Sequence, residues 1–377
     1  MRVCVDVSAA VHRRGGLGRY AHELTAALLD VDAGNEYTVF YNRPSQAQVA
    51  PPLDRLRHLT TNLPNKPWRL SALFAHFVGL SQDRLFLGVD LFHATDHLLP
   101  RFSRLRSVFT LHDLAFHFYP ETHTPLNRWF LNVMMPHFLH AADAVIAVSE
   151  HTKRDALRAY EIDEAKVRVI YEGVHPRFQP TDLETVEVIR RKYGLPDRFI
   201  LSVGTIEPRK NLDTLLAAYR VWRGTGAAQK LVIVGKKGWL YGGFFRRLRE
   251  WGLESEILFP GFVPDDDLPS LYSGAELFIF PSLYEGFGLP PLEAMACGTP
   301  VVCADSSSLP EVVGDAALLV PPSDVAAWVE AMQRLACDAD LRARLRARGL
   351  AQARRFSWER AARETVEVYR QVMAEIR

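Results

Sequence analysis

The segment from Leu277 to Cys303 has the order strand, glycine-rich loop, helix and second strand. Leu277–Pro281 is short, apolar and rich in phenylalanine, which is typical of a strand inside a parallel sheet. A helix is expected to begin near Leu289, where two prolines follow, and to end at Gly298. This order of elements favours an α/β fold, in which helices cover a parallel sheet.

The same alternation of strands and helices continues along the chain. Strands are predicted in the first half at 3–7, 37–41, 91–94, 107–111, 144–148 and 167–171, and in the second half at 199–203, 230–234, 257–260, 277–281, 301–304 and 317–320. Helices are predicted between them, for example at 20–29, 128–140 and 150–159, and the glycines at 15, 16 and 18 are expected to form a loop. The pattern predicts two Rossmann-like domains with doubly wound parallel sheets, joined by the turn-rich segment 172–180.

Composition narrows the class of protein. The chain has 377 residues, 48% of them hydrophobic, which is enough for two buried cores. Its net charge of +1 gives no support for a nucleic-acid partner. The four cysteines and the histidines show no metal-ligand spacing, and no run approaches the roughly 20 apolar residues of a spanning helix. We therefore expect a cytoplasmic enzyme with reduced thiols and no metal.

Two carboxylates, Glu285 and Glu293, bracket the glycine loop that opens the predicted helix. Gly286 and Gly288 let the backbone approach a ligand, and backbone N–H groups at a helix start favour phosphate. Carboxylates repel phosphate, so we expect them to flank the anion and to accept hydrogen bonds from sugar hydroxyls. In the alternative interpretation, Glu293 only complements the helix dipole in the first turn and Glu285 is a solvated loop residue.

A second loop carries positive charge at the same predicted sheet edge. The strand 199–203 ends at Gly204, and Arg209 and Lys210 follow within a few residues. Arg binds phosphate oxygens as a fork and Lys as a point charge, so this loop suits a diphosphate. The alternative is that both cations are ordinary solvated loop residues.

These segments resemble the retaining glycosyltransferases of family 4, which have the GT-B fold. Glu285 and Glu293 match the family's motif of two glutamates separated by seven residues, and residues 202–213 are similar to its diphosphate-binding loop. Residues 15–19 resemble its amino-terminal glycine loop, and the pair His112 and Asp113 stands where the family has its His-Asp pair. The four landmarks occur in the family's order across nearly the whole chain.

The resemblance implies two domains that face each other across a cleft and bind different substrates. Residues 1–175 would bind the acceptor, residues 176–355 the nucleotide sugar, and residues 356–377 would form a helix that returns to the first domain. His112 is expected beside the transferred sugar, as one of four catalytic residues together with Arg209, Lys210 and Glu285. Further donor contacts are expected at Gly15, Gly16, Gly204, Thr205, Gly235, Gly261, Phe262, Val263, Gly286, Phe287, Gly288, Leu289 and Glu293.

Among the catalytic residues that the resemblance implies, Arg209 and Lys210 would hold the diphosphate. Glu285 would bind the hydroxyls of the donor sugar, and Glu293 would bind the ribose. Thr205 departs from the family pattern, because many members have Arg there, and this leaves open whether both cations contact the diphosphate. For Phe262, packing in the core is as good an interpretation as contact with the nucleobase.

The implied reaction is transfer of a hexose to an acceptor hydroxyl with retention, without a metal and with no cofactor beyond the nucleotide sugar. GDP-mannose is the first choice of donor and GDP-D-rhamnose the second, while UDP and dTDP sugars stay open. The acceptor would be a glycan or lipid-linked glycan of bacterial surface polysaccharide, such as lipopolysaccharide O-antigen. The oligomeric state is left open.

Peripheral contact with the inner membrane face is a further expectation, because residues 68–77 and 128–135 mix aromatics with cations; core-facing helices would explain the same residues. Two other functions are weighed. One is an inactive nucleotide-sugar-binding scaffold or regulatory subunit of the same fold. The other is a nicotinamide-dependent dehydrogenase, which is disfavoured because no Gly-x-Gly-x-x-Gly with a suitable acidic residue follows a strand.

Overall fold

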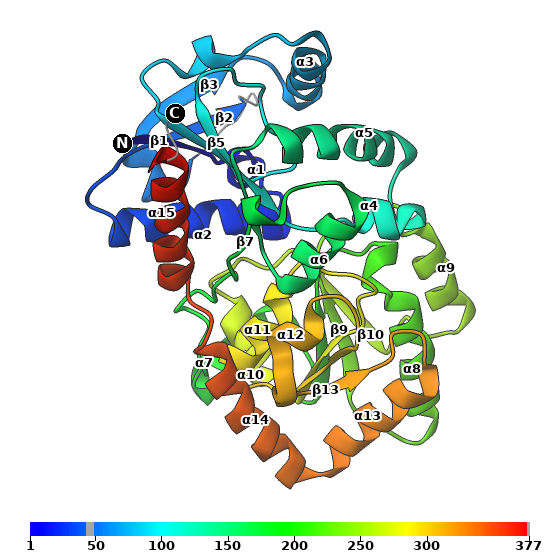
Figure 1. Cartoon of the computed structure of the whole chain (residues 1–377). Helices are drawn as coiled ribbons and strands as arrows, with labels where there is room; N and C mark the ends of the chain where they lie inside the picture. Colours follow the sequence, from blue (N-terminus) through cyan, green and yellow to red (C-terminus); the bar gives the residue numbers. More distant parts are fainter. Residues whose placement is uncertain (43–48, 375–377) are drawn as a thin grey trace. The chain divides into compact units, whose positions relative to one another are not determined.

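The computed structural model describes residues 1–42 and 49–374. The chain forms two compact α/β units (Figure 1). The first comprises Met1–His117, Pro125–Gly173 and the C-terminal segment from Ser357, and the second comprises Phe118–Thr124 and Val174–Phe356. Residues 43–48 and 375–377, which fall in the predicted first domain and the predicted terminal helix, lie outside the described residues.

In its described part, the first unit has a seven-stranded, wholly parallel sheet with the strand order β3-β2-β1-β4-β5-β6-β7. The strands are β1 (Arg2–Asp6), β2 (Glu36–Asn42), β3 (Arg57–Thr61), β4 (Leu91–Ala94), β5 (Arg106–Leu111), β6 (Ala144–Ala147) and β7 (Val167–Val169). Sequence analysis missed β3. This strand lies at the sheet edge, and its sequence Arg-His-Leu-Thr-Thr contains a single large aliphatic residue, so it lacks the apolar signal of a buried strand.

Helices pack against this sheet, and short 3-10 turns connect some of the elements. The helices of the first unit are α1 (Ser8–Val11), α2 (Gly15–Val31), α3 (Asn65–Val78), α4 (Ala115–Phe118), α5 (Pro125–Ala141), α6 (Glu150–Ala159) and α15 (Trp358–Ala374). Its 3-10 turns are Leu53–Arg55, Asp83–Phe86 and Glu164–Lys166, and the turn Pro120–Thr122 belongs to the second unit.

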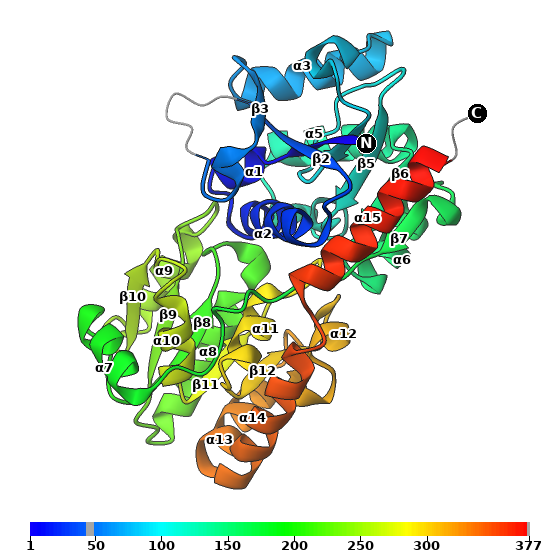
Figure 2. The same ribbon diagram turned by 90° about the vertical axis from the view of Figure 1, so that its left-hand side faces the viewer.

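Helix α15 is the last element of the chain and packs on the first unit. It lies beside α2, as Figure 2 shows, with the Trp358 ring 5.8 Å from the ring of Tyr20. The chain passes very close to the start of α15 at Gly173, where a Cβ atom would lie 2.1 Å from the backbone nitrogen of Trp358. Only glycine fits this close approach of two backbone segments.

The second unit has a six-stranded parallel sheet within the described residues, with the order β10-β9-β8-β11-β12-β13. Its strands are β8 (Phe199–Val203), β9 (Lys230–Val234), β10 (Ile257–Gly261), β11 (Leu277–Phe280), β12 (Val301–Ala304) and β13 (Ala317–Val320). The four residues of β11 and of β12 are all buried, which explains why both strands read as continuous apolar runs.

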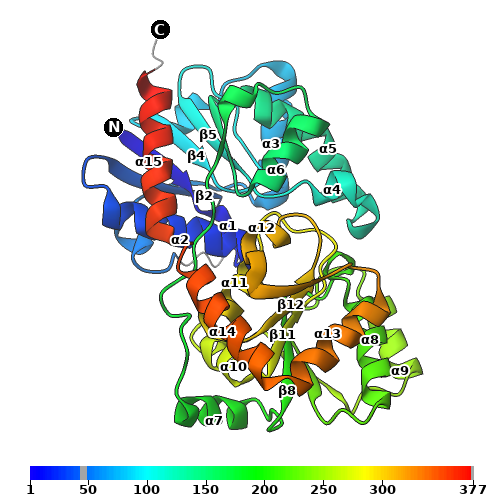
Figure 3. The ribbon, with the colours of Figure 1, turned by 60° about the horizontal axis from the view of Figure 1, so that its bottom comes forward.

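Helices cover both faces of this second sheet (Figure 3). They are α7 (Leu183–Lys192), α8 (Leu212–Gly224), α9 (Gly242–Glu250), α10 (Leu268–Gly274), α11 (Leu289–Ala296), α12 (Leu309–Val313), α13 (Val325–Cys337) and α14 (Ala339–Ala353), with 3-10 turns at Pro208–Lys210 and Gly314–Ala316. The prediction of two doubly wound parallel-sheet units is confirmed. Because all strands of a parallel sheet end at one edge, the loops after β8 to β12 are gathered there.

Candidate functional site

Three glycines bring the loops after β8, β9 and β10 into contact. The backbone N–H of Gly204 donates to Val234 O at 2.9 Å, and the N–H of Gly235 donates to Gly261 O at 2.9 Å. A Cβ atom on Gly235 would lie 1.9 Å from Gly204 O, which excludes any larger residue there. The structure thus gathers these predicted donor residues at one end of the sheet.

A buried cluster of ion pairs lies beside these loops. Arg209 and Lys210 occupy a 3-10 turn after β8, and both bind the carboxylate of Glu285. Arg209 Nη1 lies 2.8 Å from Glu285 Oε2, and Lys210 Nζ lies 2.5 Å from Glu285 Oε1. Glu207, to which the sequence assigned no role, binds Arg209 Nη2 at 2.9 Å. Three of the four predicted catalytic residues therefore meet at one point.

This cluster is electrostatically balanced and almost closed to solvent. Its two cations and two carboxylates have side chains between 2% and 14% exposed, so the interpretation as solvated loop charges is wrong. Burial by itself raises the pKa of Glu285, but the charges of Arg209 and Lys210 outweigh burial and hold that pKa below its ordinary value. Glu285 is therefore a carboxylate that holds both cations in place before any ligand arrives.

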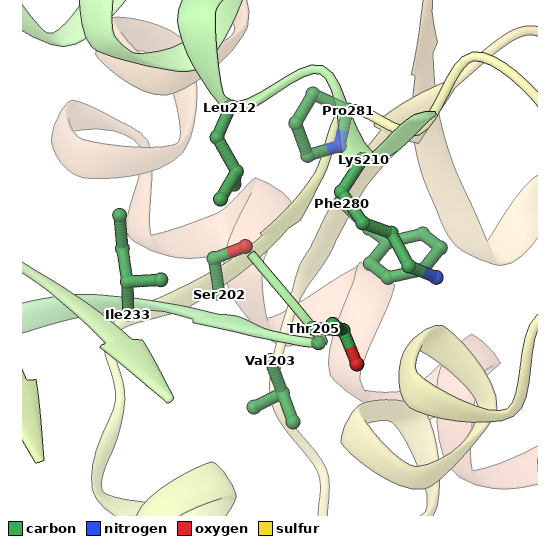
Figure 4. A pocket seen from close by; sticks show the side chains of 9 residues that line it. Ser202, Val203, Thr205, Lys210, Leu212, Ile233, Phe280 and Pro281 are labelled. Carbon is green, nitrogen blue, oxygen red and sulfur yellow. The ribbon is translucent and has the colours of Figure 1, made fainter. Parts of the chain in front are cut away.

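A small pocket opens at the end of β8, next to Lys210. Figure 4 shows Thr205, Lys210 and Phe280 around it, and the Lys210 ammonium lies 5.0 Å from the centre of the Phe280 ring. A Cβ atom on Gly204 would lie 3.5 Å from Lys210 Cε, which is an ordinary van der Waals contact, so the lysine chain runs directly past this glycine. The pocket is lined by Ser202, Val203, Gly204, Thr205, Lys210, Leu212, Ile233, Phe280 and Pro281.

Serine hydroxyls fix the loop that carries Glu285. Ser282 Oγ donates to Glu285 Oε1 at 2.5 Å, and the backbone N–H of Glu285 donates to Ser307 Oγ at 2.8 Å. Ser308 Oγ contacts the carbonyl oxygens of Glu285 and Phe287 at 2.9 and 2.7 Å. No role was predicted for these serines. For Ser307 and Ser308 the signal was a run of three serines shortly after β12, and Ser282 directly follows the predicted strand 277–281, at the sheet edge where the site is expected.

Helix α11 begins next to Glu285, and the position of Glu293 on this helix differs from one interpretation of the sequence. Gly288 precedes α11 with φ of +124°, and a Cβ atom there would lie 2.9 Å from Leu309 Cδ2. Glu293 is the fifth residue of α11 and is 1% exposed, with one oxygen accepting from the Tyr272 hydroxyl at 2.9 Å. The interpretation of Glu293 as a first-turn dipole partner is therefore wrong, and its contact with a ribose stays a prediction. Phe287 and Leu289 are buried.

The loops after β9 and β10 carry an exposed aromatic ring. Phe262 is 60% exposed, and the Lys236 ammonium lies 4.7 Å from the centre of its ring. The alternative that Phe262 packs in the core is wrong, whereas the next residue, Val263, is buried. The contact of this segment with the nucleobase, which the resemblance implies, stays a prediction.

His112 lies at the carboxyl end of β5 in the first unit and is buried. Its Nε2 lies 3.0 Å from Thr95 O, and its Nδ1 lies 3.6 Å from Glu172 Oε1. Burial lowers the pKa of His112, but the hydrogen bond and the charge of Glu172 outweigh burial and raise that pKa above its ordinary value. Both ring nitrogens face protein acceptors, which favours the protonated ring. The contact of His112 with the transferred sugar stays a prediction.

The glycines after α1 lie in the first turn of α2, so the predicted loop at this point is wrong. Arg13, with φ of +52°, ends the short helix α1 and turns the chain, and α2 begins at Gly15. A Cβ atom on Gly15 or Gly16 would meet nothing within 4 Å, whereas one on Gly18 would lie 2.8 Å from Ala9 O. Gly18 is therefore needed for packing, whereas the space around Gly15 and Gly16 is open and their contact with the donor stays a prediction.

In the part of the chain that the structure describes, no three His, Cys, Asp or Glu side chains are arranged to hold a metal ion. Cys4, Cys297 and Cys303 are buried, while Cys337 is exposed.

Two family models match the chain, one in each half. Residues 14–178 match the model described as Glycosyltransferase Family 4, and residues 185–352 match the model described as Glycosyl transferases group 1.

The chain is similar to characterised bacterial proteins along most of its length. It is 35% identical over 283 residues to O-antigen chain mannosyltransferase B of Escherichia coli, covering 74% of each chain. It is 35% identical over 237 residues to the serotype-specific mannosyltransferase WbdA of Escherichia coli, which corresponds to 62% of this chain but only 29% of that larger protein.

Solved structures of the same fold cover almost the whole chain. Sucrose-phosphate synthase from Thermosynechococcus elongatus has a TM-score of 0.80 at 24% identity and matches over 99% of both chains. Anabaena HepE, solved with UDP and glucose, has a TM-score of 0.75 at 20% identity and matches over 98% of both chains.

Proposed function

Because this chain belongs to the family 4 glycosyltransferases, we propose that it transfers mannose from GDP-mannose to a hydroxyl of a glycan or lipid-linked glycan acceptor. It has the GT-B fold, with two Rossmann-like parallel-sheet units. Its similarity to two O-antigen and serotype-specific mannosyltransferases supports mannose as the sugar and bacterial surface polysaccharide as the product. GDP-D-rhamnose is the second choice of donor.

The observation that carries this proposal is the buried cluster of Arg209, Lys210 and Glu285 at the carboxyl edge of the second sheet. When a glycosyl bond to a nucleoside diphosphate breaks, negative charge develops on the leaving phosphate. Cations that are already fixed beside that phosphate stabilise the charge without reorganisation, and this lowers the barrier. In this proposal they supply the positive charge at the phosphate, so the reaction proceeds without a metal.

Glu285 has two tasks in the proposed site. It fixes the positions of Arg209 and Lys210, and it accepts hydrogen bonds from the outer hydroxyls of the donor sugar. A diphosphate that arrives at Lys210 shares the cations with Glu285, which frees carboxylate lone pairs for those hydroxyls. Glu293, buried on α11 and bound by Tyr272, would take the ribose hydroxyls.

We propose that transfer retains the anomeric configuration. In this scheme the sugar passes through an oxocarbenium-like state, the acceptor oxygen attacks from the face that the phosphate leaves, and the departing phosphate takes the acceptor proton. Lys210 and Arg209 hold the leaving group throughout. His112 of the first unit, with Gly15 and Gly16 at the start of α2, completes the proposed set of donor contacts.

The proposal is tested by incubating the protein with GDP-mannose and a lipid-linked glycan acceptor. GDP release that depends on acceptor, with an α-linked product by NMR, is the expected result. Acceptor-dependent nucleotide release with GDP-D-rhamnose, a UDP sugar or a dTDP sugar, and not with GDP-mannose, would show that this other compound is the donor. Nucleotide binding without transfer from any donor would favour the inactive scaffold over the enzyme.

A further inference from the structure

The exposed apolar side chains of the first unit are gathered in one region. Ten large apolar residues of this unit are exposed within the described part of the chain, and all of them lie between residues 63 and 87 or at positions 126 and 129. The apolar ridge is defined here as the exposed residues on helices α3 and α5. It consists of Leu70, Phe74, Phe77, Val78, Leu126 and Trp129.

The spacing of the ridge residues on α3 places them on one helix face. Leu70, Phe74, Phe77 and Val78 follow the i, i+4, i+7, i+8 pattern of an apolar stripe, and each is between 49% and 59% exposed. The opposite face of α3 packs against the rest of the first unit, where Trp68, Ala72 and Ala75 are buried. Helix α3 therefore has a second apolar face that the first unit does not use.

Helix α5 extends the ridge beside α3. The Arg69 guanidinium lies 4.1 Å from the centre of the Phe130 ring and donates to Asn127 at 3.1 Å, and Phe77 meets His137 edge-on at 5.1 Å. Side chains of the two helices thus meet at two places, and Figures 1 and 3 show α5 next to α3. Leu126 and Trp129, which are 70% and 53% exposed, lie in the first turns of α5, close in sequence to Asn127 and Phe130, which Arg69 of α3 contacts.

The segments that carry the ridge contain cations and no carboxylate. The sequence from 55 to 82 contains no Asp or Glu and includes Arg55, Arg57, Lys66 and Arg69, and the sequence from 122 to 142 contains Arg128 and no acidic residue. Lys66 and Arg128 are exposed on the two ridge helices. An apolar surface of several large side chains marks an interaction site, and the two helices that carry this one have cations and no carboxylate.

We propose that the apolar ridge binds the surface of a membrane that contains anionic phospholipids. Phe74, Phe77 and Trp129 would enter the interface between headgroups and acyl chains, while Lys66 and Arg128 would meet lipid phosphates. A second copy of the chain is a poorer occupant, because a two-fold symmetric contact would place these cations opposite one another with no carboxylate on either ridge helix.

The binding is interfacial, since no helix among the described residues is long and apolar enough to cross a bilayer. A helix that lies in the interface with its apolar face down needs only a stripe such as that of α3. The inference rests on the proposed function in one respect, the lipid-linked acceptor. A protein bound to the membrane surface and an acceptor anchored in that membrane lie in the same plane and encounter each other more often.

The test is co-sedimentation of the full chain with vesicles of phosphatidylethanolamine and phosphatidylglycerol, compared with vesicles of phosphatidylcholine alone. We expect stronger binding to the anionic vesicles. The double variant Leu70→Ser/Phe74→Ser should weaken that binding by about tenfold or more, because two large apolar side chains are no longer transferred from water to the membrane interface. Lys66→Gln/Arg128→Gln should weaken it by about fivefold for each charge and reduce its salt dependence.

A matched control is the variant Leu183→Ser/Val188→Ser on α7 of the second unit, which removes two side chains that are 87% and 60% exposed. It should bind vesicles as the wild type does. Equal vesicle binding by wild type and the Leu70→Ser/Phe74→Ser variant, with unchanged melting, would overturn the proposal. So would a wild-type dimer in light scattering that the same variant converts to monomer without any vesicle binding.

Transfer to a water-soluble glycan acceptor is measured in parallel and separates this inference from the proposed function. The ridge variant should keep that transfer while losing vesicle binding. Absence of transfer in the wild type, with vesicle binding intact, would instead count against the proposed function alone.

Discussion

At the scale of single residues, Glu285 holds the two buried cations of the site in position. It is the shared anion of Arg209 and Lys210, and Ser282, Ser307 and Ser308 fix its position and backbone. A buried cation that loses its partner is costly, on the order of 3–5 kcal/mol. The same carboxylate is therefore expected to matter for folding as well as for turnover.

The variant Glu285→Gln should melt at a lower temperature than the wild type and lose most transfer activity. Inorganic pyrophosphate should raise its melting temperature more than that of the wild type, because pyrophosphate supplies the anion that the two cations have lost. Differential scanning fluorimetry with and without pyrophosphate measures this. The control Glu187→Gln removes an exposed partner of Arg190 and Arg191, and it should change neither value. An equal pyrophosphate shift in wild type and Glu285→Gln would contradict the assignment.

Some of these residues could be predicted from the sequence and others could not. Arg209, Lys210 and Glu285 follow strands of one sheet, and strand ends of a parallel sheet must meet. Glu207 and the serines at 306–308 could not be assigned, because their hydrogen bonds depend on how neighbouring loops fold over one another. The direct contact between Glu285 and both cations was not foreseen either, since the sequence gives no side-chain direction in a loop.

At the scale of elements, a buried histidine connects helix α15 to the sheet of the first unit. His93 Nδ1 lies 2.7 Å from the Tyr369 hydroxyl and Nε2 lies 2.8 Å from Thr110 Oγ1. Burial, with a smaller effect of His112, lowers the pKa of His93 to about 3. The folded state therefore requires neutral His93, whereas the unfolded chain takes up a proton below the ordinary histidine pKa of about 6.5.

This linkage predicts that the contribution of His93 to the free energy of unfolding falls as pH drops below 6.5, whereas Asp6, whose pKa burial raises to about 7, contributes in the opposite sense over the same range. The pKa of His93 is lower in the folded state than in the unfolded state. Its contribution to the free energy of unfolding is therefore complete above pH 6.5 and is lost as the pH falls toward the folded-state pKa. The loss is roughly 1 kcal/mol per pH unit, or about 2 kcal/mol between pH 6.5 and 5. His112 does not mask it, because the stability from a raised histidine pKa is complete below 6.5 and is lost only at higher pH.

Urea unfolding at pH 7, 6 and 5 measures this slope. The variant His93→Gln should be less stable at pH 7, and between pH 7 and 5 its free energy of unfolding should fall by about 2 kcal/mol less than that of the wild type. His137→Gln, which changes an exposed histidine, should keep the wild-type slope. A slope that is identical in wild type and His93→Gln would show that another group is responsible.

Most strands were predictable, because a strand buried on both faces is a continuous apolar run. Residues 199–203 and 301–304 match observed strands end to end. The errors come from elements that lack this signal. Edge strand β3 is mostly polar, and the start of α2 contains three glycines, which normally disfavour helix but are tolerated here by the packing of Gly18 against Ala9.

At the scale of the whole molecule, the first unit is completed by the last helix of the chain. Helix α15 follows the entire second unit in sequence, yet Trp358 and Tyr369 pack against Tyr20 and His93 of the first unit. The segment Phe118–Thr124 shows the converse, since it interrupts the first unit in sequence but belongs to the second. There Trp239 Nε1 donates to Thr122 O at 2.6 Å.

A chain that ends after Phe356 should therefore lose stability in the first unit and keep it in the second. We expect two thermal transitions, with the first unit melting roughly 10 °C or more below its normal temperature and the second still raised by GDP. Calorimetry with and without GDP measures both. A control that ends after Ala374 should melt as the full chain does. A single unchanged transition after removal of α15 would contradict this account.

The two-domain plan was predictable from the alternation of elements and the turn-rich segment near residue 175. The place of Phe118–Thr124 was not, because the sequence around it reads as a continuous part of the first domain, and the prediction for residues 1–175 included it. Its contacts with Trp239 and Tyr284 join residues more than 100 positions apart, and no local pattern encodes them.

The central claim is that the buried cations beside Glu285 hold the diphosphate of a nucleotide sugar. Titration calorimetry of GDP against wild type, Lys210→Met and Lys192→Met tests it most directly. Lys192 is an equally charged lysine of the second unit that pairs with Asp267 at the surface, and its loss should leave the affinity unchanged. The account predicts that Lys210→Met weakens GDP binding by roughly 10- to 100-fold, the value of a charge-assisted hydrogen bond. Equal GDP affinity in wild type and Lys210→Met would contradict it.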